Sequence, residues 1–365
     1  MSIELITSLI KANIVLAVLL TNTILLIWFE RKVVAGMQSR VGPDRAGPFG
    51  ILQTLADAIK LLLKEQILPS KADRAMYLLA PLIALVPSFL IFMIIPLGPD
   101  ITFEWQNSLY TIPLVGADLN VGVLYFLALS SIAVYSVVLA GWSSGSKYPL
   151  LGGVRASAQM ISYEAAMGLA LVPIILYSGS LSLVDIVNSQ AGNLSTSIPI
   201  LNSIVSFIPK WNIFPQFVAF GIFFIAAVAE VNRAPFDLVE AEQELVGGFH
   251  TEYSGFRFAM FFLAEYINMF NMCAITATFF LGGWLGPTFE GILPPIFSVI
   301  MPIIWLGVKT FLLLFVFVWI RATLPRLRYD QLMELGWKRM IPLSLVWLIL
   351  SAIVLGLREF GFPWS

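Results

Sequence analysis

Charged side chains, cysteine and histidine are all scarce in this sequence of 365 residues. Charged residues make up 12% of the chain and hydrophobic residues 59%, whereas a soluble globular domain carries about 25% charged residues. The mean hydropathy is +0.88. This composition excludes an ordinary soluble enzyme and predicts a protein whose surface is solvated largely by lipid.

The sequence holds one cysteine, Cys273, and one histidine, His250. One thiol forms no internal disulfide, and the two side chains together supply too few ligands for an iron–sulfur cluster or a zinc site. No nucleotide-binding loop, dinucleotide fingerprint or Ser–His–Asp set is visible. We therefore expect Cys273 to be a core residue and His250 a hydrogen-bonding residue. We expect no metal, no bound cofactor and no catalytic residue on this chain alone, so that any redox chemistry belongs to a partner.

Long apolar runs fill most of the chain. About 20 apolar residues suffice for a helix to cross the hydrocarbon core of a bilayer, and the runs are longer than the strands of a membrane barrel, which have about ten residues. We predict an all-α membrane protein, one polytopic domain over 1–365, whose first span is retained and not cleaved as a signal peptide. The eight predicted spans are 7–29, 75–97, 121–142, 156–178, 214–232, 257–285, 301–322 and 340–357.

Basic residues are distributed unevenly between the predicted loops. Loops 1–2, 3–4, 5–6 and 7–8, with their helix ends, hold 17 of the 21 Lys and Arg residues. The remaining four are Lys11, Lys210, Lys309 and Arg358. Because basic residues concentrate in cytoplasmic loops, we expect these four loops to face the cytoplasm and both termini to lie on the periplasmic side.

The first cytoplasmic loop, 30–74, contains a predicted amphipathic helix over 51–65. Leucine and isoleucine side chains repeat along one face at helical spacing, whereas Gln53, Asp57 and Lys60 lie on another. This pattern is typical of a helix that lies in the membrane interface. Whether it lines a functional cavity or only anchors the surface stays open at this point. A second basic segment covers 323–339.

The loop at 230–256 is acidic, which is unusual on a cytoplasmic side. If a short helix begins at Pro235, steps of 100° place Asp237, Glu240 and Glu244 within about 60° of one another. At least one of three carboxylates crowded in this way should hold a proton near neutral pH if the site is poorly solvated, and such a group can pass the proton on. A solvated acidic face is the alternative. The acids of this loop are Glu230, Asp237, Glu240, Glu242, Glu244 and Glu252.

Glu164, Glu265 and Lys309 fall inside predicted spans. A charge at the centre of a membrane helix costs about 2.5–3.5 kcal/mol on insertion scales, so such residues normally face a bundle interior or an ion path. The acids predict a proton route that leads to the acidic loop. The alternative is a structural ion pair, for example between Glu265 and Lys309.

Several long motifs occur together and in a specific order. They are Glu-Arg-Lys at 30–32, Gln-Ser-Arg-Val-Gly-Pro-Asp-Arg-Ala-Gly-Pro-Phe-Gly at 38–50, Leu-Ala-Asp-Ala-Ile-Lys at 55–60, Ala-Pro-Phe-Asp-Leu-Val-Glu-Ala-Glu-Gln-Glu-Leu-Val at 234–246, Phe-His-Thr-Glu-Tyr-Ser at 249–254 and Trp-Ile-Arg-Ala-Thr-Leu-Pro-Arg-Leu-Arg-Tyr-Asp-Gln-Leu at 319–332. With them the chain resembles, over almost its whole length, the H-subunit family of bacterial NADH:quinone oxidoreductase, equivalent to mitochondrial complex I subunit 1. Asp44 and Thr54 depart from the family's usual Asn and Pro.

The resemblance implies a membrane subunit of a proton-pumping translocase in the bacterial inner membrane, with quinone, whether ubiquinone or menaquinone, as the substrate. Arg31, Arg40, Asp57 and Arg321 are then expected near the membrane part of a quinone tunnel. Glu164, Glu230, Glu265 and the acidic loop are expected to couple that cavity to a proton path.

The resemblance also implies that FMN and iron–sulfur clusters reside in partner subunits. The expected partners are peripheral-arm subunits of the quinone site, including the one that holds the terminal cluster, small membrane subunits, antiporter-like subunits and lipid, with no nucleic acid.

Two other functions stay under consideration. The membrane subunit of a group 4 hydrogenase or formate hydrogenlyase shares the Pro-Phe-Asp type of motif, but the complete Phe-His-Thr-Glu-Tyr-Ser and Gly-Pro-Phe-Gly segments favour the quinone enzyme. An independent secondary ion transporter would explain the acids in the membrane, but not the long cytoplasmic motifs, which are typical of a docking platform.

Overall fold

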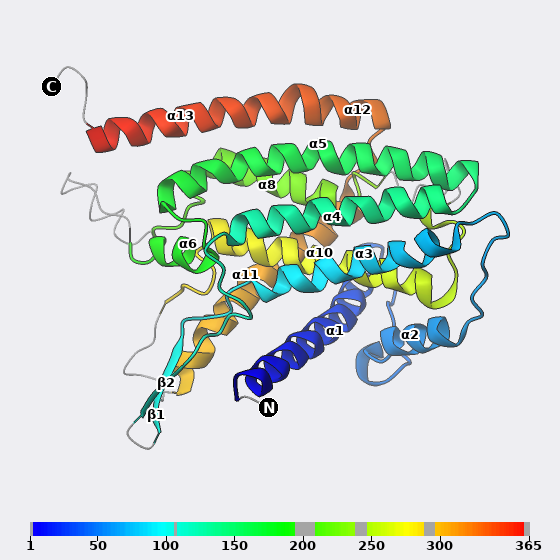
Figure 1. Ribbon diagram of the computed structural model, residues 1–365, viewed down its shortest axis with the longest axis horizontal. Helices are drawn as coiled ribbons and strands as arrows, with labels where there is room; N and C mark the ends of the chain where they lie inside the picture. The colour runs from blue at the N-terminus through cyan, green and yellow to red at the C-terminus, as the bar shows by residue number, and fades with distance from the viewer. Residues whose placement is uncertain (1–2, 106–107, 194–208, 238–246, 288–295, 361–365) are drawn as a thin grey trace.

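The fold is a bundle of long helices. The computed structural model describes residues 3–105, 108–193, 209–237, 247–287 and 296–360 (Figure 1). Within them, seven helical spans are long and apolar enough to cross a membrane by length and composition. These are α1 (Ile3–Met37), α3 (Arg74–Met93), α4 (Gly122–Ser143), α5 (Lys147–Ser178), α10 (Gly255–Phe280), α11 (Ile296–Thr323) and a composite span of α12 (Tyr329–Glu334), the π-helical turn Leu335–Met340 and α13 (Ile341–Phe360). The predicted all-α membrane fold is confirmed.

The predicted span 214–232 corresponds to α8 (Phe217–Glu230), which has only 14 residues. At 1.5 Å per residue it is about 21 Å long, less than the hydrocarbon thickness of about 30 Å. Its alanines Ala219, Ala226 and Ala227 are fully buried, and α8 packs along α5. The small side chains allow this close approach, so α8 is an inner element of the bundle.

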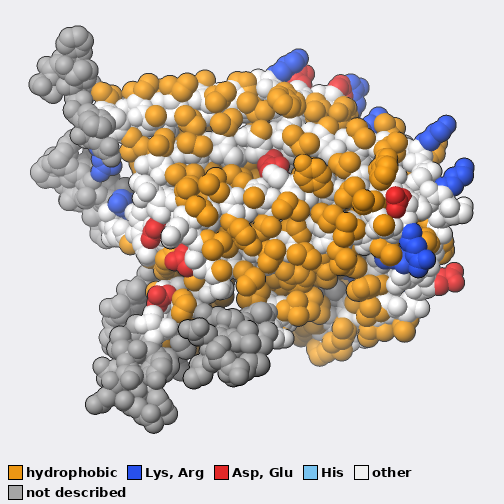
Figure 2. Space-filling model, viewed as in Figure 1, with side chains coloured by type: hydrophobic (Ala, Val, Ile, Leu, Met, Phe, Trp, Pro, Cys, Tyr) orange, Lys and Arg blue, Asp and Glu red, His pale blue; other side chains and the backbone are white. Residues whose placement is uncertain are grey.

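The connections alternate between the two ends of the bundle, as the charge pattern predicts. Figure 1 places α2 (Gln53–Leu63) and the α4–α5 turn at one end, and the hairpin of β1 (Ile101–Trp105) and β2 (Ser108–Ile112) at the other. Hydrogen bonds join the four basic connections at the first end: Asp73 N to Ser143 O, Ile67 N to Ser254 Oγ, and Leu327 N to Pro235 O. Figure 2 shows many Lys and Arg side chains gathered at this end, beside a broad apolar surface.

Two features of the fold were not predicted. The antiparallel β1–β2 hairpin interrupts the all-helical pattern, with Ile101 opposite Ile112. In addition, α5 begins at Lys147, whereas the predicted span begins at 156. The glycines Gly152 and Gly153 are unfavourable inside a helix and suggested a helix end, but they lie inside α5. They let the backbones of Gly248 and Gly141 approach α5 closely. A short helix, α6 (Leu183–Ser189), follows α5.

The helix predicted over 51–65 is present as α2 (Gln53–Leu63). Leu55, Ile59 and Leu62 are exposed on one side of it, whereas Asp57 faces α1. The exposed leucines and isoleucine form the apolar face that an interface helix would turn toward lipid.

Candidate charge-coupling site

Glu30, near the inner end of α1, is the most buried of the carboxylates that the structure describes at the basic end. It is only 5% exposed, and it accepts a hydrogen bond from Arg321 at the end of α11. Arg233, in the turn after α8, places its Nη1 atom 3.6 Å from the same carboxylate. A buried charge is tolerated only with partners of opposite sign, and here one carboxylate has two.

Arg233 contacts a second carboxylate. Its Nε atom lies 2.9 Å from Oε1 of Glu265 on α10, and its guanidinium lies 4.4 Å from the centre of the Tyr266 ring. Because Arg233 is only 4% exposed, both ion pairs are shielded from water and interact strongly. One guanidinium therefore connects α1 with α10.

The neighbouring Arg31 points in another direction, since successive helical residues are rotated by about 100°. Its Nη1 atom lies 2.6 Å from Oδ2 of Asp57 on α2, and the Nζ atom of Lys60 lies 3.3 Å from Oδ1. Partial burial raises the pKa of Asp57, but the hydrogen bonds from Arg31, Gln53 and Lys60 outweigh it, and the pKa is lower than usual. The structure therefore keeps Asp57 ionised beside Arg31.

Arg40 is the predicted tunnel residue that the structure does not bring to this group. It follows α1 on the exposed surface, and its guanidinium donates a hydrogen bond to Gln38. Arg31, Asp57 and Arg321 are thus gathered around the end of α1, whereas Arg40 lies in the loop beyond it.

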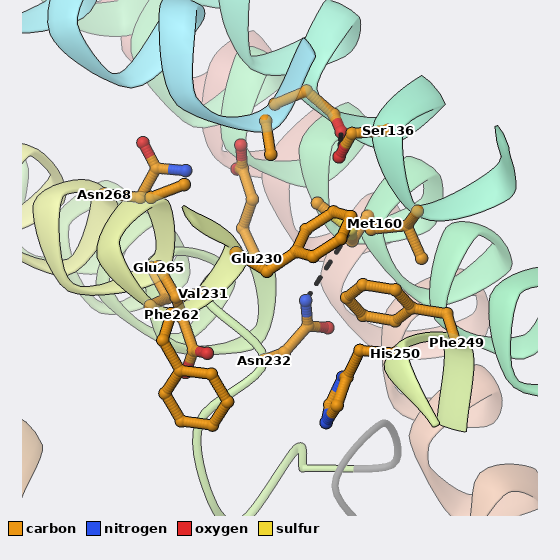
Figure 3. Close-up of a pocket in the computed structure, with 15 residues that line it drawn as sticks. Ser136, Met160, Glu230, Val231, Asn232, Phe249, His250, Phe262, Glu265 and Asn268 are labelled. Atoms are coloured by element: carbon orange, nitrogen blue, oxygen red, sulfur yellow. Dashed lines mark hydrogen bonds between the residues drawn. The ribbon is translucent and has the colours of Figure 1, made fainter. Parts of the chain in front are cut away.

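A pocket opens directly beside the Arg233–Glu265 pair (Figure 3). Glu230, Glu265 and Asn268 contribute polar groups, and the close-up shows His250 and Phe249 at its lower side. His250 packs edge to face on the rings of Phe249 and Phe258. Burial lowers the pKa of His250 to about 4, so its imidazole is neutral at pH 7.

Glu230 and Glu164 share a serine. The Ser130 hydroxyl hydrogen-bonds to the carbonyl oxygen of Leu127 at 3.0 Å, lies 3.3 Å from Oε1 of Glu164 and is also close to Glu230. Ser131 donates a second hydrogen bond to Glu164. The Oε2 atom of Glu230 is buried and has no hydrogen-bond partner within the described part of the chain, and Figure 3 shows this side chain extending into the pocket. Ser130 therefore lies beside both intramembrane carboxylates.

The acidic loop is only partly described. Asp237 is buried and pairs with Arg326, whose Nη2 atom lies 3.1 Å from Oδ2. The predicted helix does not begin at Pro235, because Pro235 lies in a turn; the fixed φ of proline suits a turn as well as a first helical residue. Glu252 contributes its carbonyl oxygen to Tyr77 Oη at 2.8 Å. Glu240, Glu242 and Glu244 lie outside the described residues.

Lys309 does not pair with Glu265. Its Nζ atom donates to the carbonyl oxygens of Leu281 at 2.6 Å and Gly283 at 2.9 Å, and it lies over the Trp211 ring at 4.2 Å. Lys309 therefore satisfies carbonyl groups beyond the end of α10, a structural role. Among the residues that the structure describes, no His, Cys, Asp and Glu side chains are grouped for a metal ion.

Glu30 and Arg233 were not singled out from the sequence. Each carried a signal: Glu30 ends an apolar run beside Arg31, and Arg233 is the one basic residue among the acids of its loop. Pairing between them could not be predicted, because it depends on how α1 crosses α8 and α10.

The comparisons with known proteins agree with this geometry. The model of the family described as NADH dehydrogenase matches residues 10–352. A protein of Koribacter versatilis, the second H-type subunit of NADH-quinone oxidoreductase in that organism, is 47% identical, over 97% of this chain and 98% of the relative. The corresponding proteins of Syntrophobacter fumaroxidans and Geobacter sulfurreducens are 51% and 50% identical, over 92% and 94% of this chain and 92% and 95% of the relatives.

These similarities extend over nearly the full length of both partners in each comparison, and they favour neither the hydrogenase subunit nor the independent transporter. The seven long apolar helices agree with a multi-pass membrane protein. The chain belongs to the H-subunit family of NADH-quinone oxidoreductase and is a membrane subunit of that enzyme complex, respiratory complex I.

Proposed function

We propose that this subunit forms the membrane part of the quinone tunnel and the first part of the proton-coupling path. The tunnel is lined near its membrane part by Arg31, Arg40, Asp57 and Arg321. Glu30, Arg233 and Glu265 transmit the charge change that accompanies quinone reduction. The observation that carries the proposal is the position of Arg233 between the carboxylates of Glu30 and Glu265.

Quinone reduction takes up two electrons and two protons per molecule, so the charge in the tunnel changes during turnover. Arg321 and Arg31 carry fixed positive charges at the end of α1. When the charge near Arg321 changes, the electrostatic environment of Glu30 changes with it, since Glu30 is buried and accepts a hydrogen bond from Arg321. Arg233 then interacts more strongly with either Glu30 or Glu265. The proton affinity of Glu265 rises when Arg233 moves toward Glu30 and falls when it moves toward Glu265.

From Glu265 the path continues through the pocket. Glu230 lines the same pocket, and Ser130 connects it to Glu164 between α4 and α5. Carboxylates inside a membrane bundle normally mark an ion path, and the proposed path passes a proton between these two neighbours. The expected continuation, beyond this chain, is toward antiporter-like subunits.

The remaining parts of the machine belong to partners. FMN and iron–sulfur clusters in peripheral subunits supply the electrons, and the partner with the terminal cluster docks on the basic end together with its neighbours. Small membrane subunits, antiporter-like subunits and lipid cover the apolar faces. The basic end faces the cytoplasm of a bacterial inner membrane, which leaves both termini on the periplasmic side.

Quinone kinetics of assembled complexes test the tunnel. Arg321→Lys keeps the charge but loses the planar donor fork, and we expect it to raise the quinone KM about tenfold at unchanged assembly. Arg328→Gln is the matched control, because Arg328 pairs with Asp330 on the exposed surface. An equal quinone KM in both variants and the wild type would show that Arg321 does not contribute to the tunnel.

The assignment of redox cofactors to partners has its own test. The purified chain is expected to show no absorption from haem, flavin or an iron–sulfur cluster, because one cysteine and one histidine are too few for a cluster or for two axial haem ligands, and no dinucleotide fingerprint is visible. A stoichiometric cofactor spectrum in the isolated chain would contradict this assignment.

A further inference from the structure

We propose that Arg326 is a positioning residue for proton coupling: by holding Asp237, it fixes the first residues of the acidic loop to the same segment that carries Arg321. This inference rests on the proposed function, since it assigns the acidic loop a part in coupling. The role is defined by contacts between loops 5–6 and 7–8, and Arg326 itself need not contact quinone.

Two neighbouring interactions join the loops. The Nη2 atom of Arg326 lies 3.1 Å from Oδ2 of Asp237, and the next residue, Leu327, donates its N–H to the carbonyl oxygen of Pro235 at 3.0 Å. Asp237 is buried, whereas Arg326 is partly exposed. A buried carboxylate needs a positive partner, so the position of Asp237 depends on Arg326.

The same two chain segments also meet at Glu30. Arg233 precedes Asp237 by four residues, and Arg321 precedes Arg326 by five. Arg233 and Arg321 both bind Glu30, while Asp237 and Arg326 bind each other. The segments are therefore tied at two points, one at the charge cluster and one at the acidic loop, and a shift at the first point is passed to the second.

The opposite side of the segment is held by α5. Gln159 Nε2 donates to the carbonyl oxygen of Phe236 at 2.8 Å, and the Phe236 ring packs on Tyr163 at a centroid distance of 5.3 Å. The segment thus lies between a rigid helix and loop 7–8. The contact with Arg326 is the one through which a movement of Arg321 can shift this segment.

Not every cation in loop 7–8 contacts the acidic loop, as Arg328 shows. It lies two residues further on, but its guanidinium binds Asp330 at 2.7 Å on the exposed surface. Such an exposed pair contributes little to stability, because water screens both charges. Arg328 is therefore the matched control, with the same charge, the same loop and no contact to the acidic loop among the described residues.

The test measures kcat, quinone KM and proton pumping per assembled complex in Arg326→Gln, Asp237→Asn, the double variant and Arg328→Gln. We expect Arg326→Gln to lower kcat and pumping about tenfold, since misplacing a functional group by about 1 Å has effects of this size or larger, with an unchanged KM. The double variant should match Asp237→Asn, because both changes break the same pair. Arg328→Gln should behave as the wild type.

Several outcomes would overturn the inference. They are normal kcat in Arg326→Gln, additive losses in the double variant, or a loss confined to the amount of complex. Arg326→Lys keeps a positive partner for Asp237 and should retain most of the wild-type kcat. If Arg326→Gln does not assemble, Asp237→Asn carries the test, and a normal kcat in that variant overturns the inference equally.

A Glu265→Gln variant separates the two proposals. If it turns over normally, the proposed coupling path is wrong. If it is impaired while Arg326→Gln is normal, the path stands and only the role of Arg326 is wrong.

Discussion

The Nε atom of Arg233 lies 2.9 Å from Oε1 of Glu265, and this single contact joins two regions that the sequence separates by a whole loop. Arg233 follows the short inner helix and Glu265 lies inside α10, next to the pocket. Through its Nη1 atom, Arg233 reaches Glu30. A buried cation between two acids is a compact means of making the proton affinity of one acid depend on the other.

Sidedness can be tested by labelling. Lys147, the first residue of α5, and Lys210, which bonds to Gly192 just beyond α6, are both exposed. Figure 1 places the α4–α5 turn and α6 at opposite ends of the bundle, and the native Cys273 is buried. In intact spheroplasts, a membrane-impermeant maleimide is expected to label Lys210→Cys but not Lys147→Cys, because basic loops face the cytoplasm. Inverted vesicles serve as the control and should show the reverse. Labelling of Lys147→Cys from outside would refute the orientation.

His250 predicts a specific acid sensitivity. Its pKa is lowered to about 4 by burial, against about 6.5 in the unfolded chain. The unfolded state therefore binds the proton more readily than the folded state. The free energy of unfolding is accordingly highest above pH 6.5, and it decreases as the pH falls toward 4.

His250→Asn removes this titration and should reduce the loss of thermal stability between pH 7 and pH 4.5 by about 2 kcal/mol. The midpoint of thermal inactivation of the assembled complex, followed against pH, measures the effect. Parallel curves for the variant and the wild type would show that His250 does not titrate in this way.

Gly152 predicts a packing limit between α5 and loop 5–6. A Cβ atom at this position would lie 2.8 Å from Gly248 Cα and 2.9 Å from the Gly248 carbonyl carbon. Because both are backbone atoms, the loop must move away. Gly152→Val should cost about 1–3 kcal/mol or more and lower the amount of assembled complex. Gly168→Val is the control, since Gly168 has only one side-chain atom within 4 Å, at 3.9 Å. Equal assembly of both variants would contradict the close contact.

The sequence predicts the fold well where hydropathy alone decides. Spans and their alternation follow from apolar length and from the basic loops, which is why α2 and the long helices could be predicted. The β1–β2 hairpin was missed although Ile101–Trp105 alternates apolar and polar residues, because so short an alternation is a weak signal beside long apolar runs. The short α8 was overestimated, since an apolar inner helix and a spanning helix have the same composition.

The candidate site is less predictable from sequence. Glu265 was singled out because an acid in an apolar run is costly, and an ion pair with Lys309 was the alternative to a proton route. Lys309 instead binds carbonyl oxygens near the far end of α10. Pairing depends on the depth and rotation of each helix, and neither quantity is contained in hydropathy.

The most direct test of the account is quinone reductase activity and proton pumping per assembled complex in Glu265→Gln and Glu230→Gln. The amide keeps the volume of the side chain but removes its titration, so both variants should assemble and both activities should fall together, by about tenfold or more. Glu334→Gln is the control, because Glu334 pairs with Lys338 on the exposed surface and should have no effect. Full activity and full pumping in both pocket variants would mean that the buried carboxylates are structural, and the proposed path would be wrong.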